Sequence, residues 1–215
     1  ANLAHLGESV GGFLTEFGAV GDDEASLELL RLQTEGADAA LQSWAYWTYK
    51  GFDDITTQNV HTETFFSSNV SAEQDVRLPG SLQSAKVKAL ARTYARAIAG
   101  TPALMEFNVT SAAFKLVFST RRPSSVAMPS VGAPAAASTT EIFLHTGFYY
   151  PSGYNVSVET SDGSKVSWTL LEEGPGPMKG GDKDDDKPVW AVLGVTTPDS
   201  DVVCDVTVRI VRASY

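Results

Sequence analysis

Two kinds of hydrophobic pattern divide this chain. Through roughly the first hundred residues, short apolar runs alternate with segments whose apolar residues recur every three or four positions, the spacing of an amphipathic helix. Over roughly the last hundred, β-branched and aromatic residues alternate with polar ones between clusters of Gly, Pro, Asn and Asp, which is typical of short strands. The pattern predicts two regions, residues 1–101 and residues 102–215.

The first region predicts alternating strands and helices. Residues 12–19 form an apolar run interrupted by one carboxylate, residues 22–40 an amphipathic helix with an acidic start, and residues 41–50 an aromatic strand. Apolar positions then recur at helical spacing over residues 82–98, before a Gly-Thr-Pro stop signal. This order is typical of parallel β/α units.

The second region predicts a β-sandwich of about seven or eight strands. Residues 121–138 and 172–187 interrupt it as loops, and the acidic run within the second loop is interpreted as solvated charge rather than a metal site. The expected strands are residues 107–110, 113–119, 140–144, 154–159, 165–170, 190–195 and 202–211.

Composition and charge narrow the classes of partner. The chain of 215 residues is 43% hydrophobic, with a net charge of −10. A nucleic-acid partner is therefore not expected, because such binding gains affinity from clustered Lys and Arg. No apolar run approaches the roughly 20 residues of a membrane-spanning helix, and residues 1–7 do not resemble a signal peptide. We expect no transmembrane segment, and any targeting segment would lie upstream.

Three N-glycosylation sequons begin at Asn69, Asn108 and Asn155. Three in one chain favour the secretory pathway, with an extracellular or lysosome- or vacuole-like destination. Cys204 is the only cysteine, so no disulfide can form within the chain. Its apolar strand context predicts a buried free thiol, with a bond to another polypeptide as the alternative.

The sharpest candidate for chemistry is Glu16, which follows Phe13 and Leu14 and precedes Phe17 near the end of an apolar strand. A carboxylate there is costly unless its charge is used or paired, so both a functional and a structural role are open. The next strand carries Trp44 and Trp47. Aromatic rings beside a carboxylate suit a sugar, although both tryptophans could equally be core.

Three segments together resemble glycoside hydrolase family 5, endoglycoceramidase and glucosylceramidase branch. They are GFLTEFG at residues 12–18, ADAALQSWAYWTYK at residues 37–50 and ALARTYARAIAGTP at residues 89–102. The TEI at residues 140–142 and the YPSGY at residues 150–154 resemble that branch's C-terminal β-sandwich. The resemblance covers nearly the whole chain and concerns the C-terminal part of the family.

The resemblance implies a fold and a site. Residues 1–101 would be the last two strand-helix units of a (β/α)8 TIM barrel, and residues 102–215 the C-terminal β-sandwich domain. Glu16 matches the catalytic nucleophile of a retaining enzyme. Trp47 matches the aromatic floor of the sugar site, and we expect Trp44 and Lys50 to contact substrate as well. The implied substrate is a glycosphingolipid or a β-glucosylceramide, cleaved without metal or organic cofactor.

The chain differs from the family pattern at the second catalytic carboxylate, which acts as the acid/base. A whole barrel takes about 250 residues, and the family's Asn-Glu acid/base pair has no counterpart, because the chain contains no Asn-Glu dipeptide. We expect these residues to be inactive alone and to need an N-terminal barrel fragment as a second chain, made by processing or by a split gene. One alternative is a non-catalytic subunit that binds carbohydrate or has a structural role. Another is a module whose function resides in the β-sandwich alone.

Overall fold

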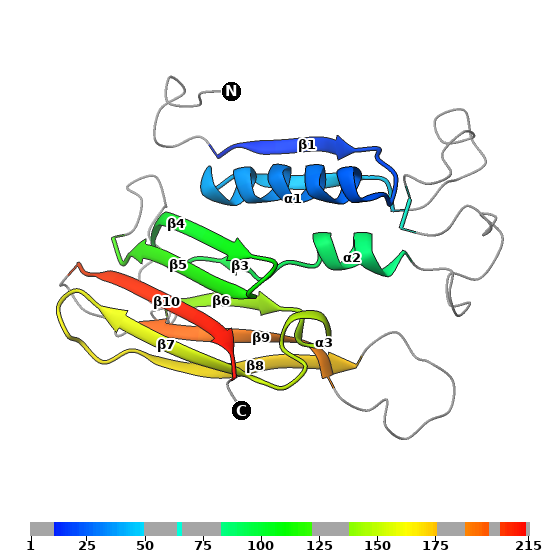
Figure 1. Cartoon of the computed structure of the whole chain (residues 1–215). Coiled ribbons are helices and arrows are strands. Elements are labelled where there is room, and N and C mark those ends of the chain that lie inside the picture. The colour runs from blue at the N-terminus through cyan, green and yellow to red at the C-terminus, as the bar shows by residue number, and fades with distance from the viewer. Residues whose placement is uncertain are drawn as a thin grey trace.

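The structure is a computed structural model that describes residues 11–49, 64–65, 83–121, 138–175, 188–197 and 203–213. Lys50 and Asn69 lie outside these residues, as do most of the two expected loops. Figure 1 shows an N-terminal unit of strands β1 and β2 with helix α1, a short helix α2, and two stacked sheets.

The N-terminal unit is a parallel βαβ unit, as the sequence predicts. Strand β1 (Phe13–Gly18) pairs in parallel with β2 (Ser43–Trp47), and α1 (Glu24–Ala39) connects them. Asp23 caps α1 by accepting a hydrogen bond from the Ser26 backbone N–H at 3.1 Å, which satisfies one of the free amides of the first turn. The peptide bond after β2, between Trp47 and Thr48, is cis.

The second predicted helix is shorter than its apolar spacing indicates. Helix α2 (Ser84–Leu90) ends at Leu90, and β3 (Tyr94–Ala97) follows as a strand that pairs with β6. The prediction of helix over residues 91–98 is therefore wrong. Tyr94 and Ala95 pair with Phe143 and Ile142 of β6, so pairing within a sheet overrides the helical spacing. Strand structure thus begins on the N-terminal side of Thr101.

The described residues beyond α2 form two four-stranded antiparallel sheets, in the orders β4-β5-β10-β7 and β3-β6-β9-β8. Six of the strands predicted beyond Thr101 are present, most of them with shifted ends, but the strand predicted at residues 107–110 covers only the last two residues of β4. The prediction of a loop from residue 172 is wrong at its start, because Glu172 and Gly174 extend β8 against β9. The bounds are β4 (Thr101–Asn108), β5 (Ala113–Ser119), β6 (Ser138–Leu144), β7 (Tyr154–Thr160), β8 (Ser167–Pro175), β9 (Pro188–Thr197) and β10 (Asp205–Arg212).

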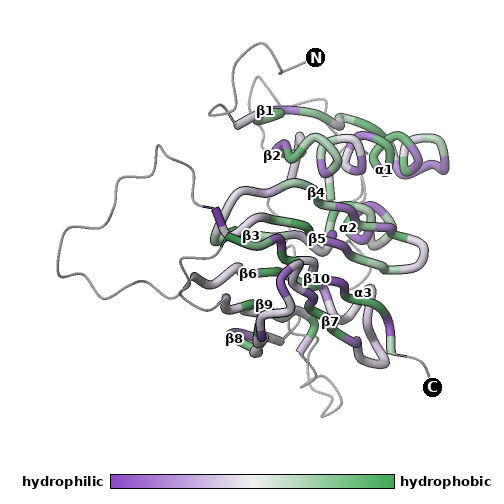
Figure 2. The backbone as a smooth tube through the Cα atoms, turned by 90° about the vertical axis from the view of Figure 1, so that its left-hand side faces the viewer, coloured by the Kyte–Doolittle hydropathy of each residue, from purple (hydrophilic) through white to green (hydrophobic). Residues whose placement is uncertain are grey.

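A hydrophobic core joins the two sheets. Alternate residues of β5 and β10 are buried to 2% exposure or less, and they meet Ile142 and Leu144 of β6 and Leu193 and Val195 of β9. This is the packing of a sandwich-like all-β region. Cys204 is buried at the edge of the same core as a free thiol, as predicted. Figures 1 and 2 both place β1, β2 and α1 on the side of β4, at the opposite end from β7 and β8.

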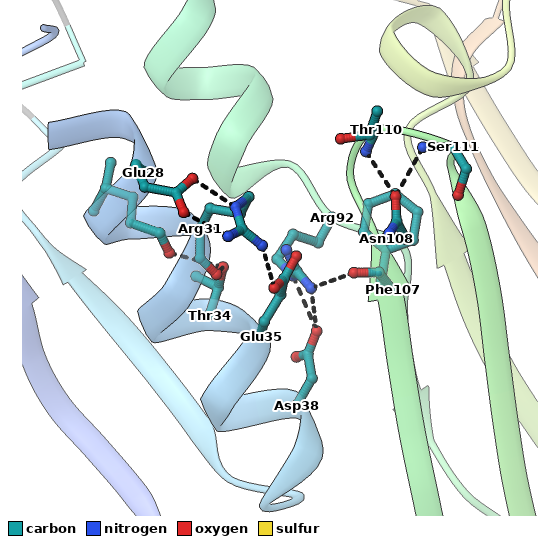
Figure 3. Close-up of polar contacts among 11 residues, drawn as sticks. Glu28, Arg31, Thr34, Glu35, Asp38, Arg92, Phe107, Asn108, Thr110 and Ser111 are labelled. Atoms are coloured by element: carbon teal, nitrogen blue, oxygen red, sulfur yellow. Dashed lines mark hydrogen bonds and ion pairs between the residues drawn. The ribbon is translucent and has the colours of Figure 1, made fainter. Parts of the chain in front are cut away.

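A buried ion pair links the N-terminal unit to the sandwich-like region (Figure 3). Arg92 and Asp38 of α1 are 1% and 5% exposed, and Arg92 Nη2 lies 2.6 Å from Asp38 Oδ2 and 2.9 Å from the Phe107 carbonyl oxygen of β4. Burial raises the pKa of the Asp38 carboxyl, while the attraction of Arg92 opposes that change. The positive charge of the Arg92 guanidinium therefore balances the negative charge of Asp38 within this buried interface.

A histidine caps the short helix α3 (Thr146–Tyr149). His145 Nδ1 accepts a hydrogen bond from the Phe148 backbone N–H at 3.2 Å, and the two rings stack with centroids 4.2 Å apart. Partial burial lowers the pKa of His145 below its ordinary value of 6.5. A protonated Nδ1 carries a hydrogen and cannot accept, so protonation removes the cap.

We therefore expect a pH-dependent contribution to stability from His145. Because the folded pKa is lowered, the unfolded chain binds the proton first, and stability present above pH 6.5 is lost as the pH falls through the folded pKa. Asn is a good capping residue without a titratable ring, so His145→Asn should flatten the dependence of unfolding free energy on pH in this window. Denaturant titrations of both proteins at several pH values measure the two slopes, and equal slopes would refute the assignment.

Candidate active site

The candidate nucleophile lies near the carboxyl end of β1, in an irregular part of the parallel pair. The register runs Leu14 to Trp44 and then Phe17 to Tyr46, so Thr15 and Glu16 together face the single residue Ala45. Such a bulge re-aims the side chain that it carries. Glu16 is exposed, and among the described residues its carboxylate has no hydrogen-bond or ion-pair partner. Because it is exposed, the Glu16 carboxylate avoids the desolvation cost that its apolar sequence neighbours suggest.

The two faces of the β1–β2 pair have different roles. Phe17 is 8% exposed and belongs to a cluster with Leu30 of α1. Trp44 and Tyr46 meet Phe17 edge-on, with ring centroids 5.4 and 5.8 Å away. Side chains alternate along a strand, so this face packs on the helices.

By the same alternation, Glu16 and Trp47 belong to the opposite face. Trp47 ends β2 opposite Gly18, and it is partly buried outside the Phe17 cluster. Glu16 and Trp47 thus both lie outside the Phe17 cluster, near the carboxyl ends of neighbouring strands. The fold places Trp44 on the other face, packed against Phe17. Lys50 lies outside the described residues.

Gly18 makes the turn after Glu16 possible. Its φ of +107° lies in the region that favours glycine, and a Cβ there would approach Tyr46 Cε2 to 2.2 Å. The Tyr46 ring cannot withdraw easily, because it is held between Phe17 and Phe65 with centroids 5.8 and 5.4 Å away. Glycine at this position therefore keeps β1 close to β2 beside the candidate nucleophile.

Gly18→Ala should destabilise the protein and impair the candidate site. Backbone strain of this kind costs about 1–3 kcal/mol, to which displacement of the Tyr46 ring adds. Chemical denaturation measures the free energy of unfolding. Gly36→Ala serves as the matched control, since a Cβ at Gly36 meets nothing within 4 Å and Ala is the better helix former in α1. Equal stability of the Gly18 and Gly36 variants would contradict this account of the turn.

Backbone contacts join the segments that follow the two strands. The Ala19 N–H donates to the Trp47 carbonyl oxygen at 2.8 Å, and the Phe65 N–H donates to the Tyr49 carbonyl oxygen at 3.0 Å. Lys86 of α2 is fully buried, and its Nζ donates to the carbonyl oxygens of Val20 at 2.9 Å and of Thr64 at 3.2 Å. Sequence reasoning missed Lys86, although its position one turn before the buried Leu90 places it on the apolar face of α2.

A separate groove of about 990 Å³ lies between α1, α2 and the turn after β4. Val109, Leu27 and Tyr149 contribute apolar surface, and Glu28 and Lys88 are among its charged residues. None of Glu16, Trp44 and Trp47 lines it. The groove is therefore distinct from the candidate site.

Two sequons lie within the described residues, and both asparagines are exposed. Asn108 ends β4, and its side-chain oxygen accepts hydrogen bonds from the backbone N–H groups of Thr110 at 3.0 Å and Ser111 at 2.8 Å (Figure 3). Asn155 lies on β7, an edge strand. Neither carboxamide is enclosed by the fold.

Two further observations concern metals and membranes. Within the described ranges, no group of three or more His, Cys, Asp or Glu side chains is placed to hold a metal ion. The helices in the described part of the chain are too short or too polar to cross a membrane.

Comparison with known proteins agrees with this architecture. Residues 92–177 match the family model described as the glycoside hydrolase family 5 C-terminal domain. An endoglycoceramidase from Hydra vulgaris is 30% identical over 149 residues, which are 69% of this chain and 23% of that protein. An endoglycoceramidase from Cyanea nozakii is 25% identical over 169 residues, 76% of this chain and 28% of that protein. The chain thus spans about a quarter of these relatives.

Solved structures show the same fold at lower identity. Endo-glycoceramidase II from Rhodococcus sp., in complex with a five-membered iminocyclitol, superposes with a TM-score of 0.54 at 19% identity, covering 100% of this chain and 36% of that one. Sterylglucosidase 1 from Cryptococcus neoformans gives a TM-score of 0.51 at 18% identity, covering 89% of this chain and 24% of that one. Residues 92–177 thus match the glycoside hydrolase family 5 C-terminal domain, and the chain is similar to the C-terminal part of endoglycoceramidases.

Proposed function

We propose that this chain contributes the nucleophile to a retaining β-glycosidase that hydrolyses glycosphingolipids or β-glucosylceramide. The observation that supports the proposal is the exposed carboxylate of Glu16 near the carboxyl end of β1, whose parallel partner β2 ends at Trp47. Carboxylates at the carboxyl ends of parallel barrel strands face a common active site. The relatives named endoglycoceramidase supply the substrate class of the proposal.

In this proposal, β1 and β2 are the seventh and eighth strands of a (β/α)8 barrel. Among the described residues, the two strands pair only with each other, so each presents an open edge. Phe13 at the start of β1 and Tyr49 just after β2 are 58% and 52% exposed. The open edges and exposed aromatic side chains favour pairing with further strands, because unpaired backbone groups and uncovered apolar faces cost free energy in a parallel sheet.

The reaction needs a second carboxylate that these residues do not supply. Glu16 attacks the anomeric carbon as the leaving ceramide oxygen takes a proton from the second carboxyl group, which gives a glycosyl ester on Glu16. The second group, now a carboxylate, then deprotonates a water that displaces Glu16 from the anomeric carbon. We assign this group to the N-terminal part of the barrel, on a second chain or on the same one. The 215 residues alone would then be inactive.

Trp47 is proposed as the aromatic floor on which the sugar ring stacks, with Lys50 contacting hydroxyl groups. Trp44 would act only indirectly, because its ring packs against Phe17 on the helix side. The exposed Asn108 and Asn155 support glycosylation in the secretory pathway, with Asn69 as a third acceptor. The reaction requires no metal or organic cofactor.

The stereochemistry of the first product tests this proposal. The natural enzyme that contains these residues is incubated with a glycosylceramide, and the anomer released first is identified by NMR. Retention predicts the β-anomer of the free sugar together with ceramide. The α-anomer would overturn the nucleophile role of Glu16, and absence of hydrolysis by the native assembly would favour a carbohydrate-binding subunit. Native mass shows whether a second chain is present.

A further inference from the structure

We propose that Lys86 is a positioning residue that fixes the segment after Glu16 against the segment after Trp47. The inference rests on the proposed function, since it concerns the geometry of the same site. Lys86 is fully buried, yet its ammonium is directed to backbone carbonyls of two segments far from it in sequence, at Val20 and at Thr64.

The Val20 contact bears directly on the nucleophile strand. Val20 lies four residues after Glu16, beyond a turn in which Gly18 and Ala19 both have positive φ. Ala19 is held to the end of β2 by its hydrogen bond to the Trp47 carbonyl oxygen, and Val20 is held to α2 by Lys86. The exit from β1 is thus fixed at two consecutive residues, which constrains the strand end that carries Glu16.

The Thr64 contact bears on the strand of Trp47. Phe65 is bonded to the Tyr49 carbonyl oxygen, two residues after Trp47, and its own carbonyl oxygen accepts from the Gln83 N–H at 2.7 Å. Lys86 binds the neighbouring Thr64 carbonyl oxygen, which also accepts from Gln83 Nε2 at 3.1 Å. One ammonium group therefore connects the exits of both strands of the candidate site.

A lysine suits this task better than an uncharged residue. An ammonium has three donors and no acceptor, and charged donors make stronger hydrogen bonds to carbonyl oxygens than neutral ones. Burying a charge costs free energy unless such bonds compensate it. Helix α2 therefore buries this charge where it can bond to the segments after β1 and β2.

The test measures the attack by Glu16 separately from folding. A 2,4-dinitrophenyl 2-deoxy-2-fluoro-β-glucoside traps the glycosyl-enzyme, and its leaving group needs no proton, so the trapping rate constant reports on the nucleophile. The amplitude of dinitrophenolate release counts competent sites. A purely structural role would lower the amplitude and leave the rate constant unchanged.

In the complete enzyme, Lys86→Met should lower the trapping rate constant by about ten- to a hundredfold, as expected for a nucleophile displaced by up to about 1 Å. Lys86→Arg, which keeps a cation with several donors, should restore most of the rate. Lys88→Met is the matched control, because it makes the same substitution two residues away at an exposed position of α2, and it should leave the rate unchanged. If Lys86→Met does not fold, Lys86→Gln replaces it, since its shorter amide falls short of both carbonyls.

An unchanged rate constant in the folded Lys86 variant would overturn the positioning role. That failure is distinct from failure of the proposed function. If the fluoroglucosyl label maps to a residue other than Glu16, the site assignment is wrong whatever Lys86 does. If it maps to Glu16 and Lys86→Met traps at the normal rate, only the positioning role is wrong.

Discussion

Glu16→Gln in the complete enzyme should lower kcat for a glycosylceramide by at least about a thousandfold, because removing a nucleophile eliminates the covalent route. The amide keeps the shape of the side chain, and Glu16 is exposed and makes no ion pair within the described residues. Folding and sugar binding should therefore persist. Turnover assays, thermal unfolding and a sugar-binding isotherm measure the three quantities.

Glu106→Gln is the matched control for that variant. Glu106 is an exposed glutamate on β4, outside the β1–β2 pair, so its substitution should leave turnover unchanged. Retained turnover in Glu16→Gln would refute the nucleophile assignment. Loss of folding in that variant would instead show that Glu16 has a structural role.

Arg92→Ala should destabilise the protein by about 3–5 kcal/mol, because it leaves the Asp38 carboxylate buried without its partner. It also removes the bond to the Phe107 carbonyl oxygen and the guanidinium that lies 5.2 Å from the Phe107 ring centroid. Chemical denaturation measures the effect. Arg209→Ala makes the same substitution in an ion pair whose side chains are 43% and 66% exposed, and it should change the midpoint little.

The pH dependence of Arg92→Ala identifies the cause of its instability. Burial already raises the pKa of Asp38, and loss of the guanidinium raises it further. A group with a raised folded pKa stabilises the fold below its unfolded pKa, and that contribution is lost as the pH rises through the folded pKa. The variant should therefore recover stability on acidification, and adding Asp38→Asn should abolish the recovery. A pH-independent loss would point to packing instead.

Most of the fold follows from the hydrophobic pattern. Alternation identified strands such as β5, where Phe114, Leu116 and Phe118 are buried in turn, but it found only the end of β4, whose burial is irregular. The pattern failed between Leu90 and Ile98, where apolar residues at helical spacing form the strand β3. Its pairing with β6 depends on residues far away in the sequence, which local spacing cannot report.

The site was predictable in part. The motif at residues 12–18 predicted Glu16 as the candidate nucleophile, whereas Trp44, expected to contact substrate, packs against Phe17 instead. The bulge at Thr15 and Glu16 could not be read from the sequence, because register depends on the partner strand. Lys86 was missed because the carbonyl oxygens that it binds belong to segments 66 and 22 residues away.

The covalent bond between Glu16 and the sugar can be detected directly. The complete enzyme is incubated with the fluoroglucosyl reagent, digested, and mapped by mass spectrometry. We expect one fluoroglucosyl group per active site, on the peptide that contains Glu16, and none on the Glu16→Gln variant. A label on any other carboxylate, or release of dinitrophenolate without a covalent adduct, would contradict this expectation.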